Sequence, residues 1–458
     1  MTLTKRPRMI SIFSLIMINI IAVDNLRSLP ISATYGLSLF FLYGLIAIFF
    51  FIPCALVTAE LATGWPTTGG IYIWVREAFG KRWGFFVISM QWMYNIVWFP
   101  TIMAFIAGNC LYYFNPELSH NPYVIFIIVL ALFWITTAIN CLGMTASALL
   151  SNLGALVGTL MPMLFISVLG FIWLWGGHPL PYEFTQSAWI PDFSKPNSYA
   201  FLVAILFGLM GLEMSAVHAE EVHNPKRSYP LALLISVILI LVTLICSSLA
   251  IALVVPASEL SIITGLIQAF QLFFTAFGLT MLTPVIVGCI VIGSLAGVGA
   301  WMIGPVKGVY AAAKDGCLPA CFSRLNRYQV PYNILLIQGT IFTLLSSLFL
   351  ILPTVSGTYW ILSDMTAQLG LFVYLGLFAS ALKLRYKKHM VARAFTLPFG
   401  KIGLWMVCSC AFICCIFVML LGFFPPTQIN VGNIILYECI LIFGMTFFCA
   451  LPFIIYRK

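Results

Sequence analysis

The chain has 458 residues, of which 62% are hydrophobic and only 8% are charged, and its formal net charge at pH 7 is +9. Because a typical soluble domain carries about 25% charged residues, this composition excludes a soluble globular protein of this length. The 13 cysteines lie mostly inside apolar runs and form no CxxC pair, which argues against a disulfide scaffold or a zinc site. We therefore expect an integral membrane protein.

A helix needs roughly 20 apolar residues to cross the hydrocarbon core of a bilayer. The first such stretch follows a basic start, as in a signal peptide, but no small-residue cleavage site comes after it, so we interpret it as an uncleaved helix. In chain order, transmembrane helices are predicted over residues 10–34, 36–62, 83–113, 122–141, 145–175, 198–219, 229–255, 281–313, 332–352, 358–382, 402–424 and 432–455. A further stretch, 261–277, is amphipathic and is predicted to lie at the outer interface. The predicted fold class is all-α integral membrane, with about twelve transmembrane helices in one domain, 1–458.

The positions of the 22 lysines and arginines indicate the orientation of these helices. All of them except Arg27 and Lys195 fall on one side of the membrane if the N-terminus lies inside. Their segments are 5–8, 76–82, 226–227, 307–327, 383–401 and 457–458. Since loops rich in lysine and arginine stay in the cytoplasm, both termini are predicted to be cytoplasmic. The positive charge is then expected to face anionic lipid rather than nucleic acid.

The first predicted span contains two ionisable residues, Asp24 and Arg27, in the string IIAVDNLRSLP. An ionisable side chain at the centre of a membrane helix costs roughly 2.5–3.5 kcal/mol on insertion scales, so it usually has a function. Ser28 and Pro30 follow and predict a break in the helix, which is tolerated only where the backbone is buried in protein or lines a cavity. We expect a discontinuous helix that contacts a substrate. The alternative is an ion pair between Asp24 and Arg27, three residues apart, that neutralises itself within the bundle; both can hold.

The sixth predicted span repeats this pattern in the string FGLMGLEMSAVHAEE, where Gly208 and Gly211 lie near the middle and Glu213 follows. Close packing of helices through small residues is the alternative explanation. Two interrupted helices five spans apart favour two inverted five-helix repeats, over about 10–175 and 198–382, with two further helices over 402–455. A binding site would then lie between the two breaks.

A polar and aromatic stripe is predicted on one face of the third span, since positions i, i+3, i+4 and i+7 share a helix face. Such a stripe serves either helix packing or the lining of a cavity. Its members are Gln91, Tyr94, Asn95 and Trp98. Weaker candidates are Trp301 in the eighth span and Asp364, Gln368 and Tyr374 in the tenth.

The sequence offers no pattern for catalysis or for a cofactor. The cluster of His218, Glu220, Glu221 and His223 lacks the HExxH spacing that places two histidine ligands on one helix face. Walker A, GxSxG and glycine-rich phosphate motifs are missing as well. We therefore expect neither an enzyme nor a metal or cofactor site, and no ATP-driven transport by this chain alone.

The string GLMGLEMSAVHAEEVHNPKRSYPLAL (208–233) resembles the region between the sixth and seventh helices of amino acid–polyamine–organocation (APC) permeases, and most closely the glutamate/γ-aminobutyrate antiporter branch. Further similarity lies in FIPCALVTAELATGWPTTGGIYIWVREAFGKRWGFF (51–86), IPDFSK (190–195), WMIGPVKGVYAAAKDGCLP (301–319) and PFGKIG (398–403). The resemblance implies a LeuT-like fold with substrate held at broken helices 1 and 6. It also implies exchange of an external amino acid for an internal one or its decarboxylation product.

Carried onto this sequence, the resemblance implies a substrate site built from both breaks, the third span and the eighth span. We expect Arg27 to hold a substrate carboxylate through paired hydrogen bonds, and Asp24 or Glu213 to face the amine or carry a proton. The predicted substrate-binding residues are Ala22, Val23, Asp24, Asn25, Arg27, Ser28, Tyr94, Asn95, Trp98, Phe207, Gly208, Met210, Gly211, Glu213 and Trp301.

The sequence departs from the antiporter branch at three places. The first break lacks the glycines common in these permeases, and Arg27 stands where an aromatic residue is usual. Gly297 stands where a glutamate is usual, and the chain ends at Lys458, so no C-terminal tail is expected to plug the inner mouth. Neither glutamate as the substrate nor acid-gated activity is therefore implied.

The function predicted from the sequence is an amino-acid exchanger that works by alternating access in a cell inner membrane. Its expected partners are a small amino-acid substrate and the lipid bilayer, not nucleic acid, and it would act as a monomer or homodimer. The nearest alternative is a proton-coupled uptake permease for neutral amino acids. A channel and an intramembrane enzyme are the remaining alternatives.

Overall fold

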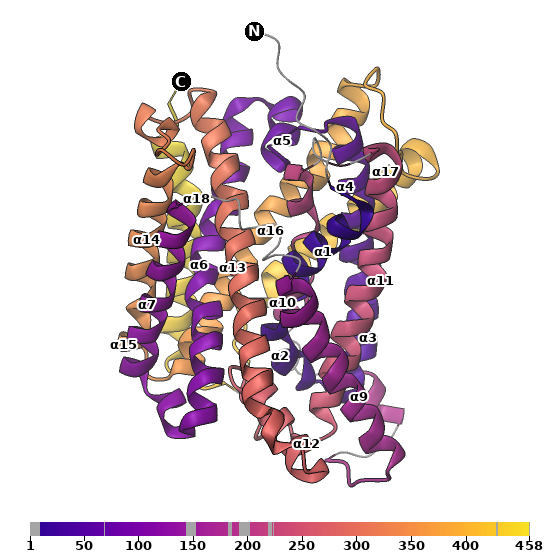
Figure 1. Cartoon of the computed structure of the whole chain (residues 1–458). Helices are drawn as coiled ribbons and strands as arrows, with labels where there is room; N and C mark the ends of the chain where they lie inside the picture. The colour runs from indigo at the N-terminus through magenta and orange to yellow at the C-terminus, as the bar shows by residue number, and fades with distance from the viewer. Residues whose placement is uncertain are drawn as a thin grey trace.

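The computed structural model describes residues 10–67, 69–142, 153–181, 186–191, 202–218, 222, 224–426 and 429–457. It is almost entirely helical, and the described residues hold one isolated parallel bridge, between Ile10 and Val222. The helices in chain order (Figure 1) are α1 (Ile12–Val23), η1 (Leu26–Ser28), α2 (Leu29–Ala33), η2 (Gly36–Ser38), α3 (Leu39–Ile46), η3 (Ala47–Phe51), α4 (Ile52–Gly64), α5 (Ile71–Phe79), α6 (Lys81–Phe114), η4 (Pro116–His120), α7 (Pro122–Cys141), η5 (Gly154–Leu160), α9 (Met161–Trp175), η6 (Gln186–Trp189), α10 (Leu202–Gly208), η8 (Leu212–His218), α11 (Pro225–Ala252), α12 (Gly265–Phe277), η9 (Thr280–Leu282), α13 (Thr283–Lys314), η10 (Ala320–Ser323), α14 (Tyr332–Ser346), α15 (Leu348–Ile351), α16 (Val355–Lys387), α17 (Gly400–Leu421) and α18 (Ile434–Ile455).

Eleven helical runs among the described residues are long and apolar enough to cross a membrane, which confirms an all-α integral membrane protein. The sixth predicted span, 198–219, begins outside the described residues, and its described part is divided between α10 and η8. At 1.5 Å per residue, neither piece alone can cross a hydrocarbon core of about 30 Å. Within the amphipathic stretch 261–277, residues Gly265–Phe277 form α12, and its place at the outer interface stays a prediction.

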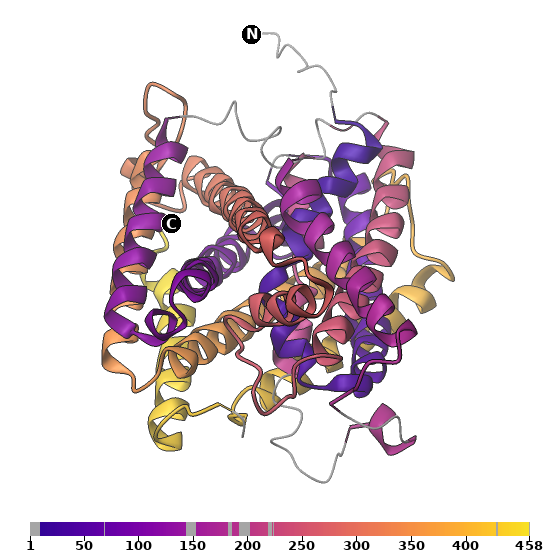
Figure 2. The same cartoon turned by 60° about the horizontal axis from the view of Figure 1, so that its bottom comes forward.

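The long helices α6, α13 and α16 form the middle of the molecule. Figure 2 shows α7 and α14 beside one another at one flank, and α9 with α11 at the opposite flank. The interior between them is filled by buried apolar and aromatic side chains. The outer faces of the flanking helices expose large hydrophobic residues, as expected for surfaces that meet lipid rather than water.

The first predicted break is present. The helix α1 ends at Val23, and Asp24 and Asn25 have extended backbones before η1 begins. The side chain of Asn25 accepts a hydrogen bond from the Arg27 backbone N–H at 3.0 Å, and Ser28 Oγ donates to the Asn25 carbonyl at 2.7 Å. These bonds satisfy backbone groups that the interrupted helix leaves open. Pro30 occupies the first turn of α2, where its missing N–H does no harm.

The second predicted break lies between α10 and η8. Gly211 has φ +129°, a conformation that residues with a side chain rarely adopt. The backbone N–H of Gly211 donates to Tyr374 Oη of α16 at 2.7 Å. Contacts of α1 with η8 and of η1 with α10 bring the two breaks side by side.

One end of the bundle, drawn at the top of Figure 1, collects the described basic segments. Arg76 pairs with Asp315 at 2.7 Å, and Tyr72 Oη donates to the same carboxylate at 2.6 Å. Burial raises the pKa of Asp315, but the hydrogen bonds from Tyr72 and Arg76 outweigh it and lower the pKa below its usual value. Arg385 at the end of α16 binds buried Glu60 through both carboxylate oxygens. The structure thus has one basic face, and its cytoplasmic orientation stays a prediction.

The approach of η5 to α13 gives a test of this packing. A methyl group at Gly158 would collide with the backbone of Gly293 and lie 3.0 Å from the Cys289 carbonyl. We expect Gly158→Ala to destabilise the protein by about 1–3 kcal/mol, the usual cost of overpacking, and to lower its melting temperature in detergent. The control is Gly288→Ala on α13, where nothing lies within 4 Å of the added methyl. Equal melting temperatures for the two variants would contradict the close approach.

Candidate functional site

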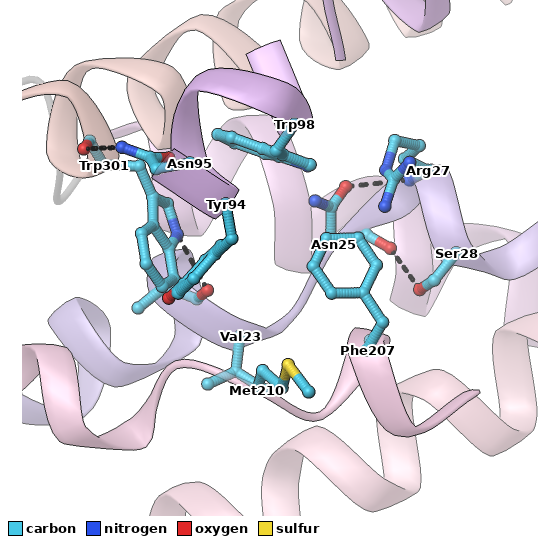
Figure 3. Close-up of a pocket in the computed structure, with 12 residues that line it drawn as sticks. Val23, Asn25, Arg27, Ser28, Tyr94, Asn95, Trp98, Phe207, Met210 and Trp301 are labelled. Atoms are coloured by element: carbon cyan, nitrogen blue, oxygen red, sulfur yellow. Dashed lines mark hydrogen bonds between the residues drawn. The ribbon is translucent and has the colours of Figure 1, made fainter. Parts of the chain in front are cut away.

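A small cavity lies between the two breaks, enclosed by α6 and α13 (Figure 3). As it stands it has room for a few water-sized groups rather than for a whole amino acid, so a ligand must displace side chains. Twelve of the fifteen residues predicted for the substrate site line it. These are Ala22, Val23, Asn25, Arg27, Ser28, Tyr94, Asn95, Trp98, Phe207, Gly208, Met210 and Trp301.

Arg27 contributes a buried cation to this cavity, with 3% of its surface exposed. Its Nη1 donates to Thr101 Oγ1 at 3.0 Å and to Ser363 Oγ at 2.9 Å. Its guanidinium also lies over the Phe207 and Tyr359 rings, with centroid distances of 4.9 and 5.5 Å. All four partners are neutral, and in the described part of the chain no ion pair includes Arg27.

Within the described part of the chain, the remaining hydrogen-bonding edge of Arg27 makes no hydrogen bond. Both Nη1 hydrogens are used by Thr101 and Ser363, and buried Nε has no partner. Nη2 donates no hydrogen bond to any other described residue. The Nε and Nη2 donors form the planar fork that binds a carboxylate through two parallel hydrogen bonds. The site therefore offers a positive charge and a free donor pair to an anionic group.

Aromatic rings form the wall of the cavity opposite Arg27. Trp301 Nε1 donates to the Ala22 carbonyl at 3.0 Å, and Asn95 Nδ2 donates to the Trp301 carbonyl, which fixes the indole against the α1 break. The Tyr94 and Trp98 rings lie 5.9 and 6.2 Å from the Trp301 ring, and Figure 3 shows the three around one side of the cavity. The predicted stripe on the third span thus faces the cavity over most of its length.

Asp24 turns away from Arg27. Its Oδ2 accepts a hydrogen bond from Thr243 of α11 at 2.8 Å, and its buried Oδ1 has no partner. The suggested ion pair between Asp24 and Arg27 is therefore wrong, because the extended backbone at residues 24–25 sends the two side chains in different directions. Asp24 instead borders a second small cavity, together with Thr159 and Ser294. This cavity shares Asn25, Trp98 and Trp301 with the first.

Glu213 and Gly211 also lie outside the lining of the first cavity. Glu213 is buried behind it and accepts hydrogen bonds from Tyr374 Oη at 2.6 Å and Gln91 Nε2 at 3.3 Å. A β-carbon at Gly211 would lie 2.8 Å from the Ala22 carbonyl oxygen. Both residues hold the second break in place, whereas the prediction placed them on the substrate.

The sequence did not single out Thr101 and Ser363. Thr101 follows Trp98 by three residues on α6, so extending the predicted stripe by one turn would have found it. Ser363 carries no such signal, since its contact with Arg27 depends on the rotation of α16 in the folded bundle. The histidine and glutamate cluster, for which the sequence predicts no metal site, cannot be placed. Glu220, Glu221 and His223 lie outside the described residues, as does the side chain of His218.

Comparison with known proteins places these features in context. The family model described as "Amino acid permease" matches residues 8–445. An uncharacterized transporter of Legionella pneumophila is 49% identical over 451 residues, which cover 98% of this chain and 97% of the relative. A glutamate/γ-aminobutyrate antiporter of Lactococcus lactis is 33% identical over 98% of this chain and 90% of its own length. A probable agmatine/putrescine antiporter of the same species is 26% identical over 82% and 79%, respectively.

Substitution of Gly211 tests the geometry of the second break. We expect Gly211→Ala to cost about 1–3 kcal/mol, the usual strain of a residue forced into a sparsely populated conformation, and to crowd the Ala22 carbonyl. Hydrogen–deuterium exchange of residues 205–214 should therefore speed up. Gly299→Ala is the matched control, since its added methyl has open space. Unchanged exchange in Gly211→Ala would contradict the tight contact between the breaks.

Proposed function

The chain belongs to the amino acid permease family, and we propose that it is a secondary transporter that exchanges amino acids across the membrane. Membership of the family makes it a multi-pass membrane transporter of a small molecule rather than an enzyme. Two relatives that match most of the chain are named as antiporters, which supports exchange over one-way uptake.

The observation that carries the proposal is the buried guanidinium of Arg27 in the cavity, which has no ion-pair partner among the residues that the structure describes. A cation that has left water without a counter-ion is costly, and a substrate carboxylate bound through Nε and Nη2 supplies the missing charge. Thr101 and Ser363 hold the guanidinium in place while it binds. The same arrangement selects substrates that carry at least one carboxylate.

The amine of the substrate lies toward the aromatic wall. Asp24 and Glu213 do not line the cavity, so neither contacts the amine directly in this arrangement. The rings of Tyr94, Trp98 and Trp301 offer π faces, which attract an ammonium group. Asp24 lines the adjacent second cavity, where it is available to carry a proton.

Alternating access follows from the broken helices. The pieces on each side of a break can rotate separately because the residues between them make few helical hydrogen bonds. Two inverted repeats, over about 10–175 and 198–382, rock about the bound substrate, while 402–455 adds two helices outside the repeats. Trp98, Phe207 and Trp301 move aside to admit it. The basic end of the bundle faces the cytoplasm of a bacterial cell, with the protein in the inner membrane.

Removal of the Arg27 side chain is the direct test. We expect Arg27→Ala to abolish counterflow in proteoliposomes, since loss of charge-assisted hydrogen bonds worth about 1.5–3 kcal/mol each lowers affinity at least tenfold. The control is Arg324→Ala, which removes an exposed arginine outside the cavity. Equal folding of both variants is checked by size-exclusion chromatography. Undiminished exchange in Arg27→Ala would rule out the proposed role.

Competition between substrates tests the selectivity of the cavity. We expect glutamate and γ-aminobutyrate, which carry carboxylates, to compete for counterflow, and agmatine and putrescine, which carry none, to compete poorly. The reason is that Arg27 repels a second cation and finds no anion on a diamine. Efficient exchange of putrescine would contradict the predicted selectivity for carboxylates.

The mode of transport is tested separately. Proton-driven uptake into liposomes without internal substrate would favour the uptake permease over an exchanger.

A further inference from the structure

A further buried acid, besides Asp24, Glu60 and Glu213, lies in α16, away from the substrate cavity. Asp364 is only 2% exposed and packs where α16 meets the end of α17 and the first turn of α18. At 1.5 Å per residue it lies roughly 30 Å along α16 from Arg385, and therefore far from the end of the bundle where Arg385 binds Glu60. The proposed exchange mechanism does not use it.

The two oxygens that lie next to the Tyr437 hydroxyl can both take part in hydrogen bonds only if the Asp364 carboxyl group carries a hydrogen. Tyr437 Oη lies 2.8 Å from Asp364 Oδ2 and 2.9 Å from the Gly422 carbonyl oxygen. A phenol has one hydrogen, so Tyr437 can donate to only one of these two oxygens. A protonated Asp364 donates to Tyr437, which then donates to Gly422, and each of these oxygens is satisfied.

The rest of the cluster is rich in acceptors. Asp364 Oδ1 and Gln368 Oε1 are buried without a hydrogen-bond partner, while Gln368 Nε2 donates to the Met419 carbonyl at 3.0 Å. No ion pair found among the described residues involves Asp364. Gly422 packs directly against the cluster, because a β-carbon there would lie 2.7 Å from Asp364 Oδ1 and collide with Gln368 Nε2. A buried carboxylate without a cation is strongly disfavoured because it has lost its hydration, and the neutral acid avoids this penalty.

We propose that Asp364 is a proton-binding site separate from the substrate cavity, which holds a proton in the native structure and releases it in alkaline medium with loss of transport. Release leaves a negative charge on Asp364 that takes the single hydrogen of Tyr437, so the Gly422 carbonyl loses its donor and the contact of α16 with α17 and α18 loosens. The preceding residue, Ser363, hydrogen-bonds Arg27. A displacement of this turn of α16 therefore reaches the guanidinium that binds the substrate.

The charged and titratable groups near Asp364 are few. On α18, Tyr437 contacts it, and Glu438 is the next residue, on the half-exposed side of the helix. The end of α17 contributes backbone carbonyls of Met419 and Gly422 to the cluster. Arg27 lies beyond Ser363, on the other side of α16. Among these described groups around Asp364, its own carboxyl is the one that is both enclosed and without a charged partner.

Infrared spectroscopy tests the proton site without any substrate, so it is independent of the proposed exchange. We expect the pH difference spectrum of the full protein in liposomes to show the C=O stretch of a protonated carboxylic acid. A component of this band should be lost in Asp364→Asn, whereas the whole band should be retained in Glu438→Gln, a matched change one helix position from Tyr437. A band in Asp364→Asn identical to that of the wild type would overturn the site. If that variant does not fold, Tyr437→Phe should shift the band, and an unshifted band overturns the site equally.

Transport measured against pH tests the coupling. We expect counterflow by the wild type to fall in alkaline medium. Asp364→Asn, which mimics the neutral acid, should keep its acid-pH rate and lose the alkaline fall, whereas Glu438→Gln should behave as the wild type. The same alkaline fall in Asp364→Asn as in the wild type would overturn the coupling.

Discussion

The structure depends on one constraint, namely that a guanidinium is held inside a membrane protein with no carboxylate among the described residues to balance it. A lone buried cation needs polar partners and ring faces to replace water. Arg27 finds them in Thr101 of α6, Ser363 and Tyr359 of α16, and Phe207 of α10. Three separate helices are thus arranged around one side chain. The break in the first span is what lets this side chain reach between them.

The helix α16 connects the parts of the site. Ser363 contacts Arg27 near the first break, and Tyr374, three turns further on, binds both the backbone of Gly211 and the carboxylate of Glu213 at the second break. Its other face carries Asp364 toward α18. One continuous helix therefore contacts both interrupted segments and holds Asp364 against Tyr437, so a tilt of α16 changes all three contacts together.

Much of this could be predicted from the sequence because a membrane imposes a simple rule on the chain. Long apolar runs located the spans, and polar residues with proline or glycine inside them located both breaks. The spacing of Tyr94, Asn95 and Trp98 placed their face on the cavity. The directions of Asp24 and Glu213 could not be predicted, since an extended residue or a residue at a break has no helical period to orient it. Ser363 was missed because its role depends on contacts between helices far apart in sequence.

The hydrogen bond from the Trp301 indole to the Ala22 carbonyl has a consequence for how motion can be observed. It joins α13 to the last turn of α1 across the cavity wall. If α1 moves relative to α13, this bond must stretch or break, and the indole then meets a more polar surrounding. Indole emission shifts to longer wavelength in polar surroundings. The wall of the cavity thereby contains an optical reporter of its own opening, without any added label.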